Sequence, residues 1–168
     1  MPFISQPSSN GDRAEAAVGI RCPVDEVFRF YRDFRNLPRF LGDVMAVEQL
    51  GPDTYRWTVQ GPLGIRMKWT ARVTEERANE FIGYEVVPLP GLKTTWAIYL
   101  SPASETGTTQ VREVMRTPLG RVGRAGLALF GKPPAGEVPA NLQRLKEVME
   151  TGTVTDTSYS VAGKFTRS

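Results

Sequence analysis

The sequence predicts an α+β fold in which a seven-stranded, curved antiparallel sheet wraps around a long C-terminal helix, with two short helices between the first and second strands. Two patterns carry this prediction. Apolar and polar residues alternate with a period of two through most of residues 44–117, and turn signals recur there at hairpin intervals. Residues 137–150 instead repeat apolar side chains at helical spacing. A chain of 168 residues is long enough to bury the core of one such domain without a disulfide or a metal.

The first strand and both short helices are predicted N-terminal to the six remaining strands. We expect a strand over residues 14–20 (AEAAVGI), and a helix beginning in CPVDEVFRFYRD with Pro23 at its first position. Asp25 and Glu26 then lie in the first turn, where the helix dipole favours acidic residues. A second, short helical piece over residues 36–42 ends at a glycine. The buried stripe of the first helix comprises Val24, Val27, Phe28 and Tyr31.

Six further strands follow without an interruption long enough for a helix, which predicts an antiparallel meander. Such a sheet is commonly wet on one face and covered on the other. The stretch GPLGIRMKWTARVTEE shows this alternation most clearly. Its wet face comprises Arg66, Lys68, Thr70 and Arg72, and its dry face comprises Met67, Trp69, Ala71 and Val73. The six strands are predicted within residues 44–51, 54–60, 61–76, 81–87, 92–100 and 108–117.

The closing helix is predicted over residues 137–150. Its apolar stripe comprises Val138, Leu142, Leu145 and Met149. The glycine-rich segment before it, LGRVGRAGLALFGKPP, is set off from the helix by two prolines. Residues 1–12 and 151–168 are polar and lack periodicity, which predicts a flexible N-terminus and a flexible tail around a domain that spans residues 13–150.

The composition excludes several kinds of chemistry. The chain has no histidine, so a Ser-His-Asp triad, a Cys-His pair and a histidine zinc site are all ruled out. Its single cysteine, Cys22, cannot form an intramolecular disulfide, which favours a cytoplasmic location. No motif indicates a cofactor or a metal ion, and no apolar run is long enough for stable insertion in a membrane. The charges of both signs are scattered, so we expect no nucleic-acid partner, while the sequence leaves a homodimer open.

Three stretches carry a resemblance to a known superfamily. They are residues 23–50, 55–77 and 129–152, the last of which runs from a Leu-Phe-Gly segment into the closing helix. In this order they resemble the START-like, or SRPBCC, superfamily with its helix-grip fold, and within it the largely bacterial polyketide cyclase/dehydrase branch. The resemblance implies the same sheet-and-helix architecture. This fold hosts lipid carriers, hormone receptors and cyclases, so the resemblance leaves the activity open.

We expect the inner face of the sheet to bind a small hydrophobic ligand in a cavity between the sheet and the C-terminal helix. The resemblance supports this, and the candidate ligands are a lipid, an isoprenoid or an aromatic polyketide-like molecule. Three tryptophans fall on the inner face, where they either line a pocket or pack a solid core. The predicted ligand-binding residues are Trp57, Met67, Trp69, Tyr84, Thr94, Trp96, Ile98, Met115, Leu142 and Leu145.

Glu113 is the leading candidate for a residue that transfers protons. The alternation of the last strand places it between Val111 and Met115 on the inner face, a position that is normally valine or leucine in the branch that the chain resembles. Burial raises the pKa of a carboxyl and lets it donate or accept a proton, and Tyr84 is the expected partner. Two other interpretations stay open: a bulge that turns Glu113 to solvent, or a buried arginine that pairs with it.

Two alternatives to simple ligand binding stay open. The first is a polyketide aromatase/cyclase or dehydratase with Glu113 and Tyr84 as catalytic residues. The second is a protein-interaction module that uses the basic outer face of the sheet. The repeated glycines of GRVGRAG, residues 120–126, fit either a hinged lid or a helix with closely packed glycines. Cys22, at a helix start, fits either a reactive thiolate or a small buried side chain.

Overall fold

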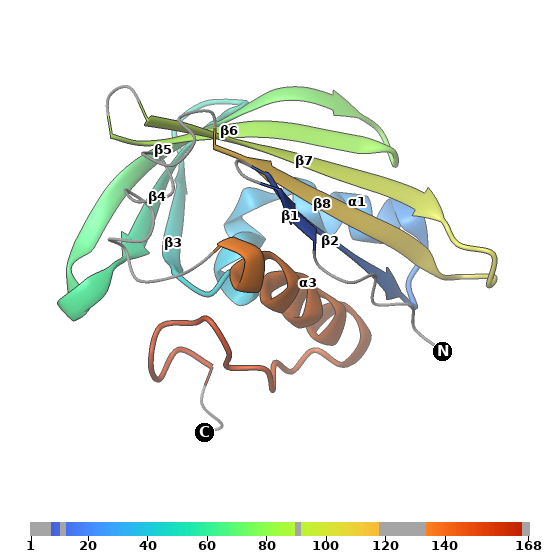
Figure 1. The fold of residues 1–168 in the computed structure, drawn as a ribbon. Coiled ribbons are helices and arrows are strands. Elements are labelled where there is room, and N and C mark those ends of the chain that lie inside the picture. Colours follow the sequence, from blue (N-terminus) through green and yellow to red (C-terminus); the bar gives the residue numbers. More distant parts are fainter. Residues whose placement is uncertain (1–7, 11–12, 90–91, 118–133, 166–168) are drawn as a thin grey trace.

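A single antiparallel sheet organises the molecule (Figure 1). The computed structural model describes residues 8–10, 13–89, 92–117 and 134–165. Within them the strand order is β1-β2-β8-β7-β6-β5-β4-β3. The strands are β1 (Ser8–Asn10), β2 (Arg13–Ile20), β3 (Val44–Gln49), β4 (Thr54–Gln60), β5 (Arg66–Arg77), β6 (Phe81–Leu89), β7 (Leu92–Pro102) and β8 (Thr109–Arg116). The predicted α+β fold is confirmed, and its seven strands are all present.

The structure adds an eighth strand at the edge of the sheet. The short β1 pairs with β2 through Ser8 to Asn10, within the stretch that the sequence analysis placed outside the domain. From β3 to β8 each strand pairs with its successor, as expected of a meander. The exception is β2, which pairs with β8 along its whole length, from Arg13 to Ile20. The first long strand therefore lies beside the last one.

Three helical elements cover the concave face of the sheet (Figure 1). They are α1 (Val24–Arg32), the 3-10 helix η1 (Phe34–Arg39) and α3 (Pro134–Thr151). A short 3-10 turn, η2 (Pro62–Gly64), connects β4 to β5. The long helix α3 packs mainly on β2 and less on β8, while α1 lies toward β7 and η1 toward β3. The cover over the middle of the sheet thus comes from the two short helices, and α3 lies toward the β2–β8 side.

The alternation read from the sequence matches the burial of the strands. On β4 the side chains of Tyr55, Trp57 and Val59 are buried, and Arg56 between the first two is exposed. The same face continues through Ile82, Tyr84 and Val86 on β6. Burial of this face against α1, η1 and α3 supplies the hydrophobic core.

A fully buried arginine joins α3 to two distant segments. Arg144 donates from Nε to the carbonyl oxygen of Phe40 at 2.7 Å, from Nη1 to the carbonyl oxygen of Ser158 at 2.6 Å, and from Nη2 to Asn141 Oδ1 at 2.6 Å. Its hydrogen-bond partners among the described residues are neutral oxygens, and burial lowers its pKa from the ordinary value. The guanidinium therefore satisfies carbonyl groups that would otherwise be buried without a donor.

These contacts fix the chain after α3. Residues 152–165 lie in the predicted flexible tail, yet the amide of Val161 donates to the carbonyl of Gly42 at 2.9 Å. A Cβ atom at Gly42 would lie 2.3 Å from the carbonyl oxygen of Tyr159, so only glycine permits this approach. The Glu147 carboxylate accepts hydrogen bonds from Thr155, at 2.6 Å from the hydroxyl. The C-terminal segment is thus bound to the domain by its own backbone.

We expect Arg144→Lys to lower the free energy of unfolding by about 2 kcal/mol or more, because lysine keeps the charge but cannot reach three oxygens in different directions. Urea unfolding measures this effect. The matched control is Arg29→Lys, since Arg29 is exposed and, within the described ranges, pairs only with Asp25 one turn away on α1, at 3.1 Å. A control effect as large as that of Arg144→Lys would contradict the special role of the buried guanidinium.

Candidate ligand-binding site

The carboxyl group of Glu113 lies on the inner face of the sheet and is fully buried. Glu113 stands opposite Ala16 of β2 on one side and Ile98 of β7 on the other. Neither pairing contains a register shift, so there is no bulge to turn the side chain outward. Its hydrogen-bond partner in the described part of the chain is a tyrosine rather than an arginine. The bulge is therefore excluded, and no arginine pairs with Glu113 among the residues that the structure describes.

Two tyrosines form a chain of hydroxyls that ends at this carboxyl. The hydroxyl of Tyr31, on α1, donates to Glu113 Oε1 at 3.1 Å, and the hydroxyl oxygens of Tyr31 and Tyr84 are 3.3 Å apart. A tyrosine hydroxyl has one hydrogen to donate. Because Tyr31 uses its hydrogen toward Glu113, Tyr84 is the donor in the second contact. The predicted partner Tyr84 thus acts on Glu113 through Tyr31.

Burial governs the protonation of this cluster. It raises the pKa of Glu113 from 4.5 to about 8, and the hydrogen bond from Tyr31 only partly opposes this rise. Burial, followed by the nearby Glu113, also raises the pKa values of Tyr31 and Tyr84 well above the ordinary tyrosine value. At neutral pH all three groups are therefore predominantly protonated, and the inner face carries a neutral carboxylic acid.

Aromatic rings fill part of the space beside the cluster. Phe34 of η1 lies against three rings of the sheet, with its ring centroid 4.8 Å from that of Tyr55, 6.2 Å from that of Trp57 and 5.0 Å from that of Tyr84. Tyr84 in turn stacks on Trp96 with ring planes 5° apart. This part of the inner face is a packed core.

Several polar atoms of the inner face remain without a partner. They are Glu113 Oε2, Trp57 Nε1, Thr94 Oγ1 and Thr117 Oγ1, each buried and making no hydrogen bond to the residues that the structure describes. A buried polar group without a partner costs about 1–3 kcal/mol, so such groups are rare unless water or a ligand completes them. The described residues thus leave these four hydrogen-bonding atoms of the inner face unsatisfied.

The predicted ligand-binding residues divide into a buried set and a half-buried set. Trp57, Tyr84, Thr94, Ile98, Met115, Leu142 and Leu145 are buried, whereas Met67, Trp69 and Trp96 are half-buried. Trp69 stands directly opposite Trp57 across β4 and β5, yet only Trp57 is closed off. The inner face therefore becomes more accessible toward the β4–β5 turn. Leu142 and Leu145 lie on α3, which packs mainly on β2, and so belong to a different part of the core.

Sequence reasoning missed two residues of the site. Tyr31 and Phe34 appear in the sequence as ordinary apolar or aromatic positions, and only the packing of α1 and η1 brings them against Glu113 and Trp57. The hydroxyl of Tyr31 within an otherwise apolar stripe was the available signal. Cys22 is half-buried and its thiol donates to the carbonyl of Met149 at 3.5 Å; burial raises its pKa, which opposes a reactive thiolate. The segment GRVGRAG lies outside the described residues.

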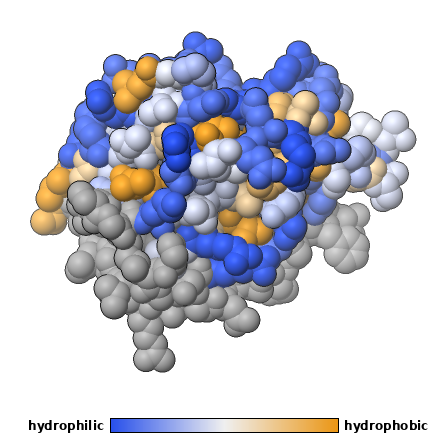
Figure 2. Space-filling view, turned by 90° about the horizontal axis from the view of Figure 1, so that it is seen from above, coloured by the Kyte–Doolittle hydropathy of each residue, from blue (hydrophilic) through white to orange (hydrophobic). Residues whose placement is uncertain are grey.

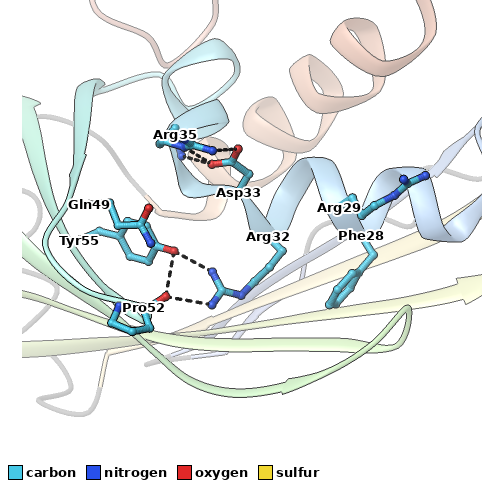
Figure 3. Close-up of a pocket in the computed structure, with 8 residues that line it drawn as sticks. All are labelled: Phe28, Arg29, Arg32, Asp33, Arg35, Gln49, Pro52 and Tyr55. Atoms are coloured by element: carbon cyan, nitrogen blue, oxygen red, sulfur yellow. Dashed lines mark hydrogen bonds and ion pairs between the residues drawn. The ribbon is translucent and has the colours of Figure 1, made fainter.

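A separate open groove lies between α1, η1 and the β3–β4 turn, with a volume of about 360 Å³ (Figure 3). Arg32 points into it but donates to Asp53 Oδ1 at 2.8 Å and to the hydroxyl of Tyr55 at 2.8 Å. Arg35 is paired with the carboxylate of Asp33 at 2.8 Å. Arg29, which also lines the groove, pairs with Asp25 at 3.1 Å, so each of the three guanidinium groups already has a carboxylate partner.

Within the described ranges, no cluster of three or more Cys, Asp or Glu side chains is arranged to hold a metal ion. The helices in the same ranges are too short or too polar to cross a membrane.

Comparison with known proteins identifies the family. Residues 12–150 match the family described as polyketide cyclase/dehydrase and lipid transport. The chain belongs to this family. Membership supports a ligand-binding role in general. A search of the curated proteins gives no match.

Solved structures with the same fold come from several bacteria. A START superfamily protein from Mycobacterium smegmatis is 15% identical, with a TM-score of 0.66 over 85% of this chain and 100% of that one. A protein from Arthrobacter aurescens is 12% identical, with a TM-score of 0.70 over 94% and 97% of the two chains. A protein from Deinococcus radiodurans is 24% identical, with a TM-score of 0.63 over 83% and 98%. These likenesses show the START-like helix-grip fold that the sequence resembles.

The buried carboxyl predicts an unusual dependence of stability on pH. Because the pKa of Glu113 is higher in the folded chain than in the unfolded chain, folding takes up a proton between pH 4.5 and about 8. The contribution of Glu113 to stability therefore falls as the pH rises through that window and levels off above it. Relative to Glu113→Gln, which does not titrate, the wild type should lose up to about 1.4 kcal/mol per pH unit.

Urea unfolding of both proteins from pH 5 to pH 9 measures this difference, because all other titrating groups are shared. A difference that stays constant over the range would show that Glu113 keeps an ordinary pKa in the folded protein.

Proposed function

We propose that this protein binds a small, largely apolar molecule that carries hydrogen-bond acceptors, on the inner face of the sheet beneath α1 and η1. The observation that supports this most directly is the set of buried, unpartnered polar atoms in an apolar surrounding: Glu113 Oε2, Trp57 Nε1, Thr94 Oγ1 and Thr117 Oγ1. Each of these is a hydrogen-bond donor when Glu113 is protonated. A ligand with carbonyl, ether or hydroxyl oxygens satisfies such a set, and a pure hydrocarbon does not.

The path to the site is proposed from the gradient of burial. Met67, Trp69 and Trp96 point to the inner face but stay half-buried, whereas Trp57 and Tyr84 are closed off. Apolar groups of the ligand would cover the half-buried side chains, and each Å² removed from water contributes about 25 cal/mol. A lipid, an isoprenoid or an aromatic polyketide-like molecule has the required combination of apolar body and oxygen atoms.

The neutral state of Glu113 favours an uncharged ligand group near it. A carboxylic acid whose Oε1 accepts from Tyr31 has its remaining oxygen available as a donor to a carbonyl. An anionic head group would gain less, since its charge would have to be buried without a cation. This proposal therefore favours a ketone, quinone, ester or phenol over a free fatty acid.

The test is to purify the protein from its own organism and to compare native with denaturing mass spectra. A co-purifying molecule with an apolar body and oxygen acceptors is the expected result. A protein that is empty, and that also fails to bind a hydrophobic fluorescent probe, would instead indicate that the inner face is a solid core.

Thr94→Val provides a matched variant for the same experiment. Valine has nearly the shape of threonine but lacks the unpartnered hydroxyl, so it should stabilise the empty protein by about 1 kcal/mol and weaken ligand retention severalfold. Thr70→Val, at an exposed position of β5, is the control and should change ligand retention little. Equal retention by wild type and Thr94→Val would remove the hydroxyl of Thr94 from the binding site.

A second candidate function is acid–base catalysis of the cyclase or dehydratase type. The observation that favours it is the buried carboxyl with a pKa of about 8, joined by hydroxyls to a second tyrosine. A group with this pKa can give and take a proton near neutral pH. Glu113 would exchange the proton with the substrate, and Tyr31 would hold its carboxyl in position.

If the ligand is also a substrate, Glu113→Gln should abolish turnover while ligand binding is retained, because glutamine keeps a hydrogen-bonding group but cannot transfer a proton. Tyr84→Phe should reduce kcat less, since Tyr84 reaches the carboxyl only through Tyr31. Turnover of the co-purified molecule is followed by mass spectrometry. Full activity of Glu113→Gln would show that Glu113 does not transfer the proton in that reaction.

A further inference from the structure

The turn between β4 and β5 carries two exposed aliphatic side chains. Leu63 is 98% exposed and Ile65 is 58% exposed, and they are separated by Gly64. Figure 2 shows a mainly hydrophilic surface with several separate hydrophobic patches, one of which lies at the left edge, the side where Figure 1 places the β4–β5 hairpin. An isolated exposed leucine is unremarkable, but two neighbouring aliphatic side chains at the tip of a projecting hairpin form an apolar point.

Neither packing nor backbone geometry explains a leucine at this position. Leu63 has a φ of 59°, in the left-handed region that favours glycine or asparagine over a leucine side chain. Its side chain does not pack in the core, because almost all of its surface is accessible to solvent. A residue that is both strained and unburied in the isolated protein indicates a role outside it.

The charges around the tip have one sign. From residue 54 to residue 74 the sequence contains four cations and no acidic residue; the cations are Arg56, Arg66, Lys68 and Arg72. All four side chains are exposed on the outer face of the hairpin. Arg56 and Arg72 are paired with Glu48 at 3.6 Å and Glu85 at 3.0 Å.

The two cations nearest the tip are not neutralised. In the described part of the chain Arg66 and Lys68 form no ion pair, and Lys68 donates only to the Thr58 hydroxyl, at 2.6 Å. The tip thus combines exposed aliphatic groups with uncompensated positive charge.

We propose that the β4–β5 tip docks on the surface of an anionic lipid bilayer, with Leu63 and Ile65 inserted at the boundary of head groups and acyl chains and with Arg66 and Lys68 at the anionic head groups. Side chains of this kind bind membranes by burying a small apolar surface and by attraction to negative lipids. A convex point with two aliphatic residues is too small for a stable protein interface, which needs a broad patch with central anchors.

Docking in this way has a consequence for the inner face. Met67 and Trp69 belong to the same hairpin, follow the tip directly in sequence and point to the inner, half-buried side. A hairpin held at a bilayer therefore brings the accessible end of the inner face to the lipid surface. The docking surface itself is separate from the ligand site, so either proposal can fail while the other holds.

The test is flotation of the full-length protein with vesicles of phosphatidylcholine mixed with phosphatidylglycerol, and with vesicles of phosphatidylcholine alone. The wild type should float with the mixed vesicles and much less with the neutral ones, and added salt should release it. The double variant Leu63→Asn, Ile65→Thr should lower the bound fraction on the order of tenfold. Asparagine suits the left-handed backbone, and threonine keeps the β-branched shape of isoleucine at the position before β5, so this variant should fold.

Two further variants separate the contributions. Arg66→Gln, Lys68→Gln should reduce binding to the mixed vesicles and abolish its salt dependence. Leu50→Asn removes a leucine that is 45% exposed at the β3–β4 turn and should leave binding unchanged. The proposal is overturned if the wild type binds neither vesicle, or if the tip variant binds as well as the wild type. A protein that binds no vesicle but changes from dimer to monomer in the tip variant also overturns it, and assigns the tip to a second copy of the chain.

Discussion

The hydrogen bond from Tyr31 to Glu113 ties together the parts on which the inner face depends. It joins α1 to β8, and α1 in turn leads directly into η1, whose first residue, Phe34, packs on Tyr55, Trp57 and Tyr84. Without a buried carboxyl on β8, the hydroxyl of Tyr31 would keep the hydroxyl of Tyr84 as a partner but would lose the acceptor for its own hydrogen. This polar contact thus joins the helical cover to the last strand at the point where the aromatic core lies beneath it.

The two buried polar centres of the molecule differ in how far their hydrogen-bonding groups are satisfied. The guanidinium of Arg144 donates hydrogen bonds to oxygen atoms on several sides, which offsets the free-energy cost of burying its charge. These bonds connect α3 to the residue after η1 and to the C-terminal segment. On the inner face, by contrast, Glu113 Oε2, Thr94 Oγ1 and Trp57 Nε1 are left without partners among the described residues. The first centre is complete in the isolated protein. The second becomes complete only when something else supplies acceptors, which is the physical basis of the proposed binding function.

Local patterns in the sequence predict what depends on one element at a time. Period two predicted the strands and the inward direction of Glu113, because each residue of a regular strand faces opposite to its neighbours. It missed β1, a strand too short for a pattern to form. The hydrogen bonds of Tyr31 and Arg144 could not be predicted in this way, because their partners lie far away in the sequence. The residue type alone does not indicate such partners. Trp57 is buried whereas Trp69 is only half-buried, and this difference depends on which helix covers which part of the sheet. The alternation of apolar and polar residues in the sequence does not report that tertiary arrangement.

The pairing of β2 with β8 determines when this site can exist during synthesis of the chain. Hairpins from β3 to β8 join neighbours in sequence and can form as each strand emerges, whereas β2 must wait for a partner whose residues, Thr109–Arg116, come almost a hundred positions later. The helix α3, which packs mainly on β2, comes later still. Glu113 lies between Ile98 and Ala16, so its full burial requires β2 as well as β7 beside β8. A nascent chain therefore carries an ordinary, ionised glutamate, and the neutral acid of the inner face is a property that only the completed protein acquires.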